Sequence, residues 1–173
     1  MRHIRRDGVC LRVADRDWDD PLSGQYALRR GGRWNPPGSF GVVYLNASVP
    51  VARAQVRQKL EPRGIRPEDL ESDQGPVLVH TVVPPDDYVD VITDRGCTSL
   101  QLPKTYPVDE QERLVGHSVC QPIGQRAWKA GEPGIACRSA ARSAPADGEE
   151  LAFFARRPLK ADQTEDFADW YWR

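Results

Sequence analysis

The segment Arg29–Gly38 holds residues whose types and spacing suit the binding of a phosphorylated ligand. Its sequence, RRGGRWNPPG, places Arg33 beside a pair of glycines and shortly before an apolar run. Glycines let the backbone approach a ligand closely, and a guanidinium can hold a phosphate or pyrophosphate through paired hydrogen bonds. The same composition also suits a surface turn in which Trp34 anchors the core. The segment alone therefore leaves both interpretations open.

Three residues further along the chain are candidates for the same site. Tyr44 lies in a predicted strand on the same face as Val42, where its ring can pack on a planar group. Gln55 lies at the border of the apolar stripe of a predicted helix, a position that can face a cleft. Ser139 ends another predicted strand and can donate a hydrogen bond to a ligand. Each also has a plain structural role, such as a serine that bonds its own backbone.

Other common chemistries lack their required residues. The sequence contains no G-x-S-x-G motif, no phosphate-binding P-loop and no G-x-G-x-x-G motif. The four cysteines are far apart, and the three histidines have no metal-ligand spacing. We therefore expect no metal site, and no serine hydrolase, kinase or dinucleotide-fold dehydrogenase.

Short strand-like and helix-like runs alternate irregularly along the chain, which favours an α+β fold over a regular βαβ array. Apolar and β-branched runs predict strands over 40–45, 77–83, 88–92, 134–139 and 151–155. Apolar spacing and capping residues predict helices over 48–60, 109–119, 122–129 and 162–172. Polar, Pro- and Gly-containing stretches predict surface loops over 61–75 and 142–150.

Length and charge restrict the class of protein. The 173 residues suit one compact domain, expected to span 1–173. The 24 Lys+Arg nearly balance the 25 Asp+Glu, and the resulting charge of −1 argues against a dedicated nucleic-acid-binding protein. No apolar run is long enough to span a membrane. Scattered cysteines are typical of a reducing compartment. We expect a soluble, cytoplasmic protein that binds neither nucleic acids nor membranes.

Taken together, the motifs resemble a known family. The segments Gly31–Gly38, Val42–Leu45 and Ser48–Pro50, in this order, are similar to the first half of the RES domain. That family is named for its Arg, Glu and Ser residues. The segments Gln121–Trp128 and Gly134–Ser139 are similar to its second half. The match runs from about residue 11 to about residue 154, nearly the whole chain.

This resemblance implies a fold and a function. It implies a mixed sheet with flanking helices, related to the ADP-ribosyltransferases. It also implies the toxin of a bacterial toxin–antitoxin pair, which consumes NAD as a substrate and is neutralised by an Xre-like helix-turn-helix antitoxin. The chemistry that the resemblance leaves open is hydrolysis, phosphorolysis or transfer of ADP-ribose to a protein.

The resemblance also implies roles for individual residues. Arg33 is the family arginine and would grip a phosphate. Tyr44 is the strand tyrosine and would pack against the nicotinamide or its ribose, and Ser139 is the family serine, which would hydrogen-bond in the same cleft. The catalytic position is residue 55, where the family has Glu and this chain has Gln55.

The neutral side chain at position 55 matters because cleavage of the nicotinamide–ribose bond develops positive charge on the sugar. Loss of a carboxylate that stabilises such charge commonly lowers the rate by about 10²–10⁴. Three explanations fit the sequence: a deliberate Glu-to-Gln change, a naturally attenuated member, or another carboxylate such as Glu61 acting instead. The alternative function is a RES-like module that binds a nucleotide or a protein without turnover.

Overall fold

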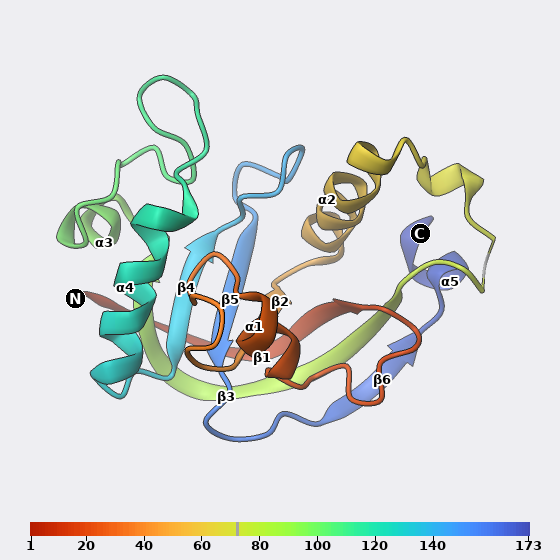
Figure 1. Ribbon diagram of the computed structural model, residues 1–173, viewed down its shortest axis with the longest axis horizontal. Helices are drawn as coiled ribbons and strands as arrows, with labels where there is room; N and C mark the ends of the chain where they lie inside the picture. The colour runs from red at the N-terminus through yellow and green to blue at the C-terminus, as the bar shows by residue number, and fades with distance from the viewer. Residues whose placement is uncertain (72) are drawn as a thin grey trace.

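Two long strands, β1 (His3–Ala14) and β3 (Val77–Val91), pair antiparallel and form a curved base for the molecule (Figure 1). The computed structural model describes residues 1–71 and 73–173. The register of this pair shifts between Arg6 and Gly8, where Gly8 has a φ of 90°. Such a bulge increases the local twist of a strand pair and helps the sheet to curve.

The rest of the sheet is built from short strands. β2 (Val42–Asn46) pairs with β5 (Glu149–Phe154), β5 with β4 (Gly134–Arg138), and β4 with the second half of β3. β6 (Ala161–Glu165) adds to the first half of β3. The β3–β4 pairing is parallel and the others are antiparallel, so the sheet is mixed. Since β1 also contacts β2, the sheet closes on itself.

The helices lie on the outer faces of this sheet. In Figure 1, α4 and α2 stand on either side of β4 and β5, α1 lies in front, and α5 lies beside the C-terminus. The helices are α1 (Gln25–Arg30), α2 (Val49–Leu60), α3 (Asp94–Ser99), α4 (His117–Lys129) and α5 (Phe167–Tyr171), with 3₁₀ turns at Glu61–Arg63 and Pro67–Asp69. The predicted α+β class with a mixed sheet is therefore confirmed.

Apolar side chains form three clusters between these layers. One packs α3 and α4 on β2, β4 and β5, and another packs α2 and α5 on β1 and β3. The third lies between the two halves of the sheet. No helix in the described part of the chain is long and apolar enough to cross a membrane.

The predicted helix over 109–119 is wrong except for its last residues. Asp109 instead accepts hydrogen bonds from the backbone N–H groups of Gln111 and Arg113, and its carboxylate also pairs with the Arg113 guanidinium. Such local side-chain bonds to the backbone compete with a helix. Glu112 also adopts a φ of 59°, which no right-handed helix contains. The helix begins only at His117 and continues through the segment predicted over 122–129.

Two further expectations need correction. The predicted strands over 77–83 and 88–92 are one continuous strand, because Pro84 and Pro85 lie opposite the bulge of β1, where the ladder is interrupted and missing N–H groups are tolerated. The predicted helix over 162–172 is divided into β6 and α5 by Asp166. Pairing with β3 overrides the helical pattern there. Residue 72 of the predicted loop over 61–75 lies outside the described residues.

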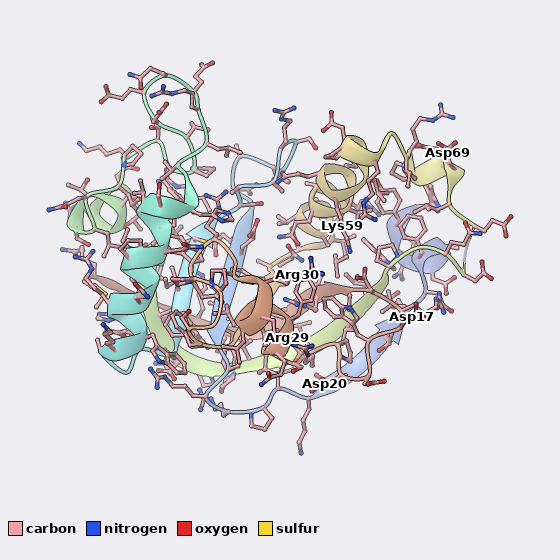
Figure 2. The ribbon with its side chains drawn as sticks, viewed as in Figure 1. Asp17, Asp20, Arg29, Arg30, Lys59 and Asp69 are labelled. Carbon is pink, nitrogen blue, oxygen red and sulfur yellow. The ribbon has the colours of Figure 1, made fainter. Side chains whose placement is uncertain are left out.

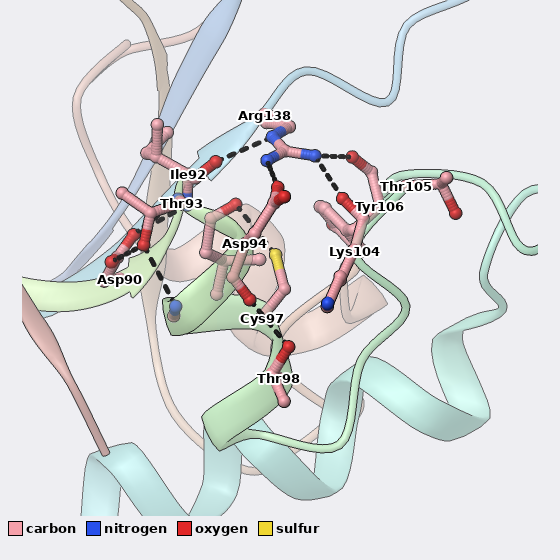
Figure 3. Close-up of polar contacts among 12 residues, drawn as sticks. Asp90, Ile92, Thr93, Asp94, Cys97, Thr98, Lys104, Thr105, Tyr106 and Arg138 are labelled. Atoms are coloured by element: carbon pink, nitrogen blue, oxygen red, sulfur yellow. Dashed lines mark hydrogen bonds and ion pairs between the residues drawn. The ribbon is translucent and has the colours of Figure 1, made fainter.

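Arg138 fixes the end of β4, directly before Ser139 (Figure 3). Its guanidinium pairs with Asp94 at 2.8 Å. It also donates hydrogen bonds to the backbone carbonyls of Ile92, Lys104 and Tyr106. One side chain thereby joins β4 to the end of β3, to α3 and to the segment that leads toward α4.

The close approach of α4 to the segment Gly31–Gly38 depends on a glycine. A Cβ atom added at Gly124 would lie 1.7 Å from the carbonyl oxygen of Trp34. From the same helix, Gln121 donates a hydrogen bond to the Gly32 carbonyl at 3.0 Å. The helix therefore packs directly against the backbone on which Arg33 is carried.

We predict that Gly124→Ala destabilises the protein, because the added methyl group must push α4 away from the Trp34 carbonyl. Overpacking of this kind typically costs about 1–3 kcal/mol. Urea unfolding of the variant and of the parent measures the difference. The control is Arg126→Ala, at an exposed position on the same helix, which we expect to change the free energy of unfolding by less than about 0.5 kcal/mol. Equal stability of Gly124→Ala and the parent would contradict the packing described.

Candidate functional site

A cleft of about 370 Å³ brings together residues from separate parts of the chain. Its walls come from the segment Gly31–Gly38, α2, the start of α4 and the first residues of β5. Its polar lining consists of Arg33, Gln55, Gln58, Lys59, His117 and Glu150. Two of the residues singled out in the sequence, Arg33 and Gln55, therefore share one cleft.

Arg33 is half-buried and held by the protein itself. Its Nη1 donates a hydrogen bond to the Val115 carbonyl at 2.7 Å and contacts Cys120 Sγ at 3.9 Å. Burial, and after it the positive charge of Arg33, lowers the pKa of His117. The imidazole at the start of α4 is therefore biased toward its neutral form. Arg33 faces the cleft and also fixes the segment before α4.

Tyr44 holds the backbone around Arg33. Its hydroxyl accepts a hydrogen bond from the Trp34 N–H at 2.9 Å and donates one to Asn35 Oδ1 at 2.8 Å. The ring lies so close to Gly32 that a Cβ atom there would be 2.6 Å from ring carbons. Burial raises the pKa of the Tyr44 phenol, so the hydroxyl keeps its proton. Tyr44 packs in the same cluster as Val42, which confirms the predicted face of the strand.

Asn35 completes this support. It is fully buried, and its Nδ2 donates to the Ala27 carbonyl at 2.7 Å and to the Phe40 carbonyl at 3.1 Å. The Asn35 side chain thus links the Tyr44 hydroxyl to α1, through Ala27, and to Phe40, shortly before β2. Sequence inspection passed over Asn35, because a fully satisfied buried amide is recognisable only from its partners.

Ser139 contacts a residue that lines the cleft, the carboxylate of Glu150. Its Oγ donates a hydrogen bond of 2.5 Å to Glu150 Oε1 and accepts one from the Ala141 N–H at 3.2 Å. Glu150 lies opposite Cys137 in the β4–β5 ladder, so its side chain and that of Ser139 emerge on the same face of the sheet. Ser139 is not among the residues that line the cleft in the described part of the chain.

Glu150, which sequence inspection missed, is the one carboxylate among the described residues that line the cleft. Glu61, the carboxylate considered from the sequence, lines a neighbouring hollow of about 520 Å³ instead. The signal available in the sequence was the pair Glu149–Glu150 directly before the apolar run of β5, since strand alternation sends one of the two to each face. Which of them faces the cleft follows only from the register.

A separate hollow of about 440 Å³ lies beside α1. Figure 2 shows Arg29 and Arg30 on α1, near the segment that carries Asp17 and Asp20. Arg29 and Arg30 therefore line a different hollow from Arg33, although they are close to it in the sequence. Lys59, labelled on α2 in the same figure, lines the cleft and pairs with Asp15 at 2.6 Å.

Arg12 is a buried cation outside the cleft lining that the sequence pattern did not reveal. It is 6% exposed, its Nη1 donates to the Tyr44 carbonyl at 2.8 Å, and its guanidinium lies 5.5 Å from the centre of the Trp18 ring. Burial lowers the pKa of Arg12 to about 10. Its Nε has no hydrogen-bond partner among the described residues.

The described part of the chain contains no group of His, Cys, Asp or Glu residues arranged to hold a metal ion.

Comparisons with known proteins agree with one another. The family model of the RES domain matches residues 9–171. Curated relatives named NAD(+) phosphorylase MbcT, from Mycobacterium bovis and Mycobacterium tuberculosis, are 29% identical over 113 residues. The matched part is 63% of this chain and 55% of each relative, so it spans about half of their length.

A solved structure shares the whole fold. It is the toxin–antitoxin complex MbcT–MbcA of M. tuberculosis, which superposes with a TM-score of 0.77 at 25% identity. The superposition covers 98% of this chain and 91% of the matched one. The arrangement of strands and helices described above is therefore shared over nearly the full length.

We predict that Tyr44→Phe lowers the free energy of unfolding by about 1–3 kcal/mol, because the buried Trp34 N–H and Asn35 Oδ1 both lose their partner. Urea unfolding measures this change. Tyr26→Phe is the matched control, since Tyr26 is 47% exposed, and we expect a change of less than about 0.5 kcal/mol. If both variants were as stable as the parent, the hydroxyl of Tyr44 would not hold this segment.

Proposed function

This chain belongs to the RES domain family, and we propose that it is an NAD-consuming toxin that cleaves the nicotinamide–ribose bond in the cleft described above. The observation that carries this proposal is the meeting of Arg33 and position 55 in one cleft, together with a carboxylate. Relatives named NAD(+) phosphorylase and a toxin–antitoxin complex of the same fold support it.

The charges of the cleft suit the two ends of this substrate. NAD carries a negative pyrophosphate, which Arg33 attracts in this proposal; Lys59 lines the same cleft but is paired with Asp15. Its nicotinamide ribose becomes positive as the bond breaks, and a carboxylate stabilises that charge. Tyr44 is not among the described residues that line the cleft, and in this proposal it acts through its hydroxyl, which holds the segment around Arg33.

The proposed reaction balances without a redox partner. The bond between ribose C1 and the nicotinamide nitrogen breaks, and its electron pair stays on that nitrogen, which neutralises the ring. An oxygen of the acceptor supplies the electron pair of the new bond to C1. With phosphate the products are nicotinamide and ADP-ribose 1-phosphate, and with water they are nicotinamide, ADP-ribose and a proton. We propose phosphate as the acceptor, because the curated relatives are named NAD(+) phosphorylases.

We further propose a cytoplasmic protein with an antitoxin partner of the Xre-like helix-turn-helix type. The matched structure is a toxin–antitoxin complex, which supports a protein partner. A polar or acidic segment inserted beside Arg33 would compete with the phosphates of NAD, because the same cation attracts both.

The second candidate function is a RES-like module that binds a nucleotide or a protein partner without turnover. The neutral side chain of Gln55 in the cleft is the observation that favours it. This second function requires no catalytic carboxylate. The two candidate functions therefore differ in whether the chain turns NAD over.

We predict that the Gln55→Glu variant, incubated with NAD and phosphate, releases nicotinamide at least as fast as the parent. A carboxylate at this position adds negative charge beside the developing positive charge. Chromatography of nicotinamide and of the ADP-ribose product measures the rate and identifies the acceptor. If neither form released nicotinamide while both bound NAD, the module without turnover would be the correct function.

We predict that Arg33→Ala weakens NAD binding by about 1.5–3 kcal/mol, or about 10- to 150-fold in Kd, since it removes a charge-assisted contact to phosphate. Calorimetric titration with NAD measures the affinity. Arg29→Ala is the control, because Arg29 is exposed and lines the separate hollow beside α1. Thermal unfolding of each variant separates a loss of binding from a loss of the Val115 contact. Equal losses of affinity for both variants would place the phosphate elsewhere.

A further inference from the structure

The cleft contains a carboxylate, although position 55 is neutral. Among the described residues that line it, Glu150 is the one acidic side chain, and it shares the cleft with Gln55 and Arg33. A site that cleaves a glycosidic bond through a positively charged transition state needs a negative group near the reacting carbon. Glu150 is therefore the residue whose chemistry matches what Gln55 lacks.

Glu150 is held firmly in place by its surroundings. Its backbone lies between two neighbours in the sheet, opposite Asn46 of β2 and opposite Cys137 of β4. The hydroxyl of Ser139 fixes the side chain through the 2.5 Å bond to Oε1. A carboxylate has a second oxygen that can face a ligand while the first one is held.

Its neighbour on β5 shows the contrast. Glu149 points to the opposite face of the sheet, where Arg6 holds both of its oxygens at 2.8 Å. No ion pair among the described residues includes Glu150. Burial, and after it the charge of Glu150, raises the pKa of the Cys137 thiol. The negative charge of Glu149 is thus neutralised within the fold, while that of Glu150 remains available to the cleft.

We propose that Glu150 is the catalytic carboxylate of this chain and that Ser139 is its positioning residue. This inference rests on the proposed function and names the group that performs it. As the bond from C1 to the nicotinamide nitrogen breaks and its electron pair passes to that nitrogen, Glu150 stabilises the positive charge on the ribose. A phosphate oxygen then supplies the electron pair of the new C1–O bond. The carboxylate is unchanged at the end of the reaction.

The first experiment replaces the charge and keeps the shape. Glu150→Gln retains an oxygen that can accept the Ser139 bond, and we expect its kcat for nicotinamide release to fall by about 10²–10⁴ while KM for NAD changes only a few-fold. The matched control is Glu149→Gln, at the adjacent position on the other face, which we expect to retain the parent rate. Melting curves establish that each variant is folded, and Glu150→Ala, which also removes the charge, serves if Glu150→Gln does not fold.

The second experiment moves the carboxylate across the cleft. In the double variant Glu150→Gln, Gln55→Glu, we expect at least about a tenfold recovery of the rate lost in Glu150→Gln, since both positions line the same cleft. For Ser139→Ala we expect a lower kcat with an unchanged KM, and partial rescue by Ser139→Thr, because a hydroxyl is needed to orient the carboxylate. A purely structural serine would alter the melting temperature without this pattern.

The outcomes separate the two proposals. If a folded variant without the charge, Glu150→Gln or Glu150→Ala, showed the parent rate, Glu150 would not be catalytic, and the proposed NAD cleavage would still stand. If the parent were inactive and Gln55→Glu alone were active, the charge at position 55 would be required and the inference would be overturned in the same way. If no form released nicotinamide, both the inference and the proposed function would be wrong.

Discussion

The hydroxyl of Tyr44 is the contact on which the candidate site depends. It joins β2 to the segment Gly31–Gly38 by accepting from one buried group, the Trp34 N–H, and donating to another, the Asn35 side chain. Unpaired polar groups in such a buried place are costly, so the segment has one well-determined position. Arg33 lies in the middle of that segment, and its place in the cleft follows from a bond made by its neighbours.

The same segment is held from the other side by α4. Gly124 allows the helix to touch the Trp34 carbonyl, and Gln121 donates to the Gly32 carbonyl. Since α4 also begins with His117 at the cleft, the helix both supports the segment and lines the site. A change in how α4 packs is therefore transmitted to two walls of the cleft at once.

Closure of the sheet brings the remaining wall into place. β5 lies between β2 and β4, and this pairing directs Glu150 toward α2 and Gln55. Among the described residues, the cleft thus combines the cations Arg33 and Lys59, the latter paired with Asp15, with one acidic group at Glu150. A substrate with a negative pyrophosphate and a ribose that becomes positive during the reaction needs both signs of charge at separate points. This combination of charges is the basis of the proposal that the cleft binds NAD.

The sequence by itself determined the features that depend on local order. The motif around Arg33, the face of Tyr44 and the helix that carries Gln55 all follow from spacing along the chain, and together with the family resemblance they identified the fold class. Only the tertiary structure decided which carboxylate enters the cleft. Glu61 is near Gln55 along the chain but lines another hollow, whereas Glu150 arrives through strand pairing. The physical reason is that strand register is set by contacts between distant segments, and a one-residue shift would exchange Glu150 for Glu149.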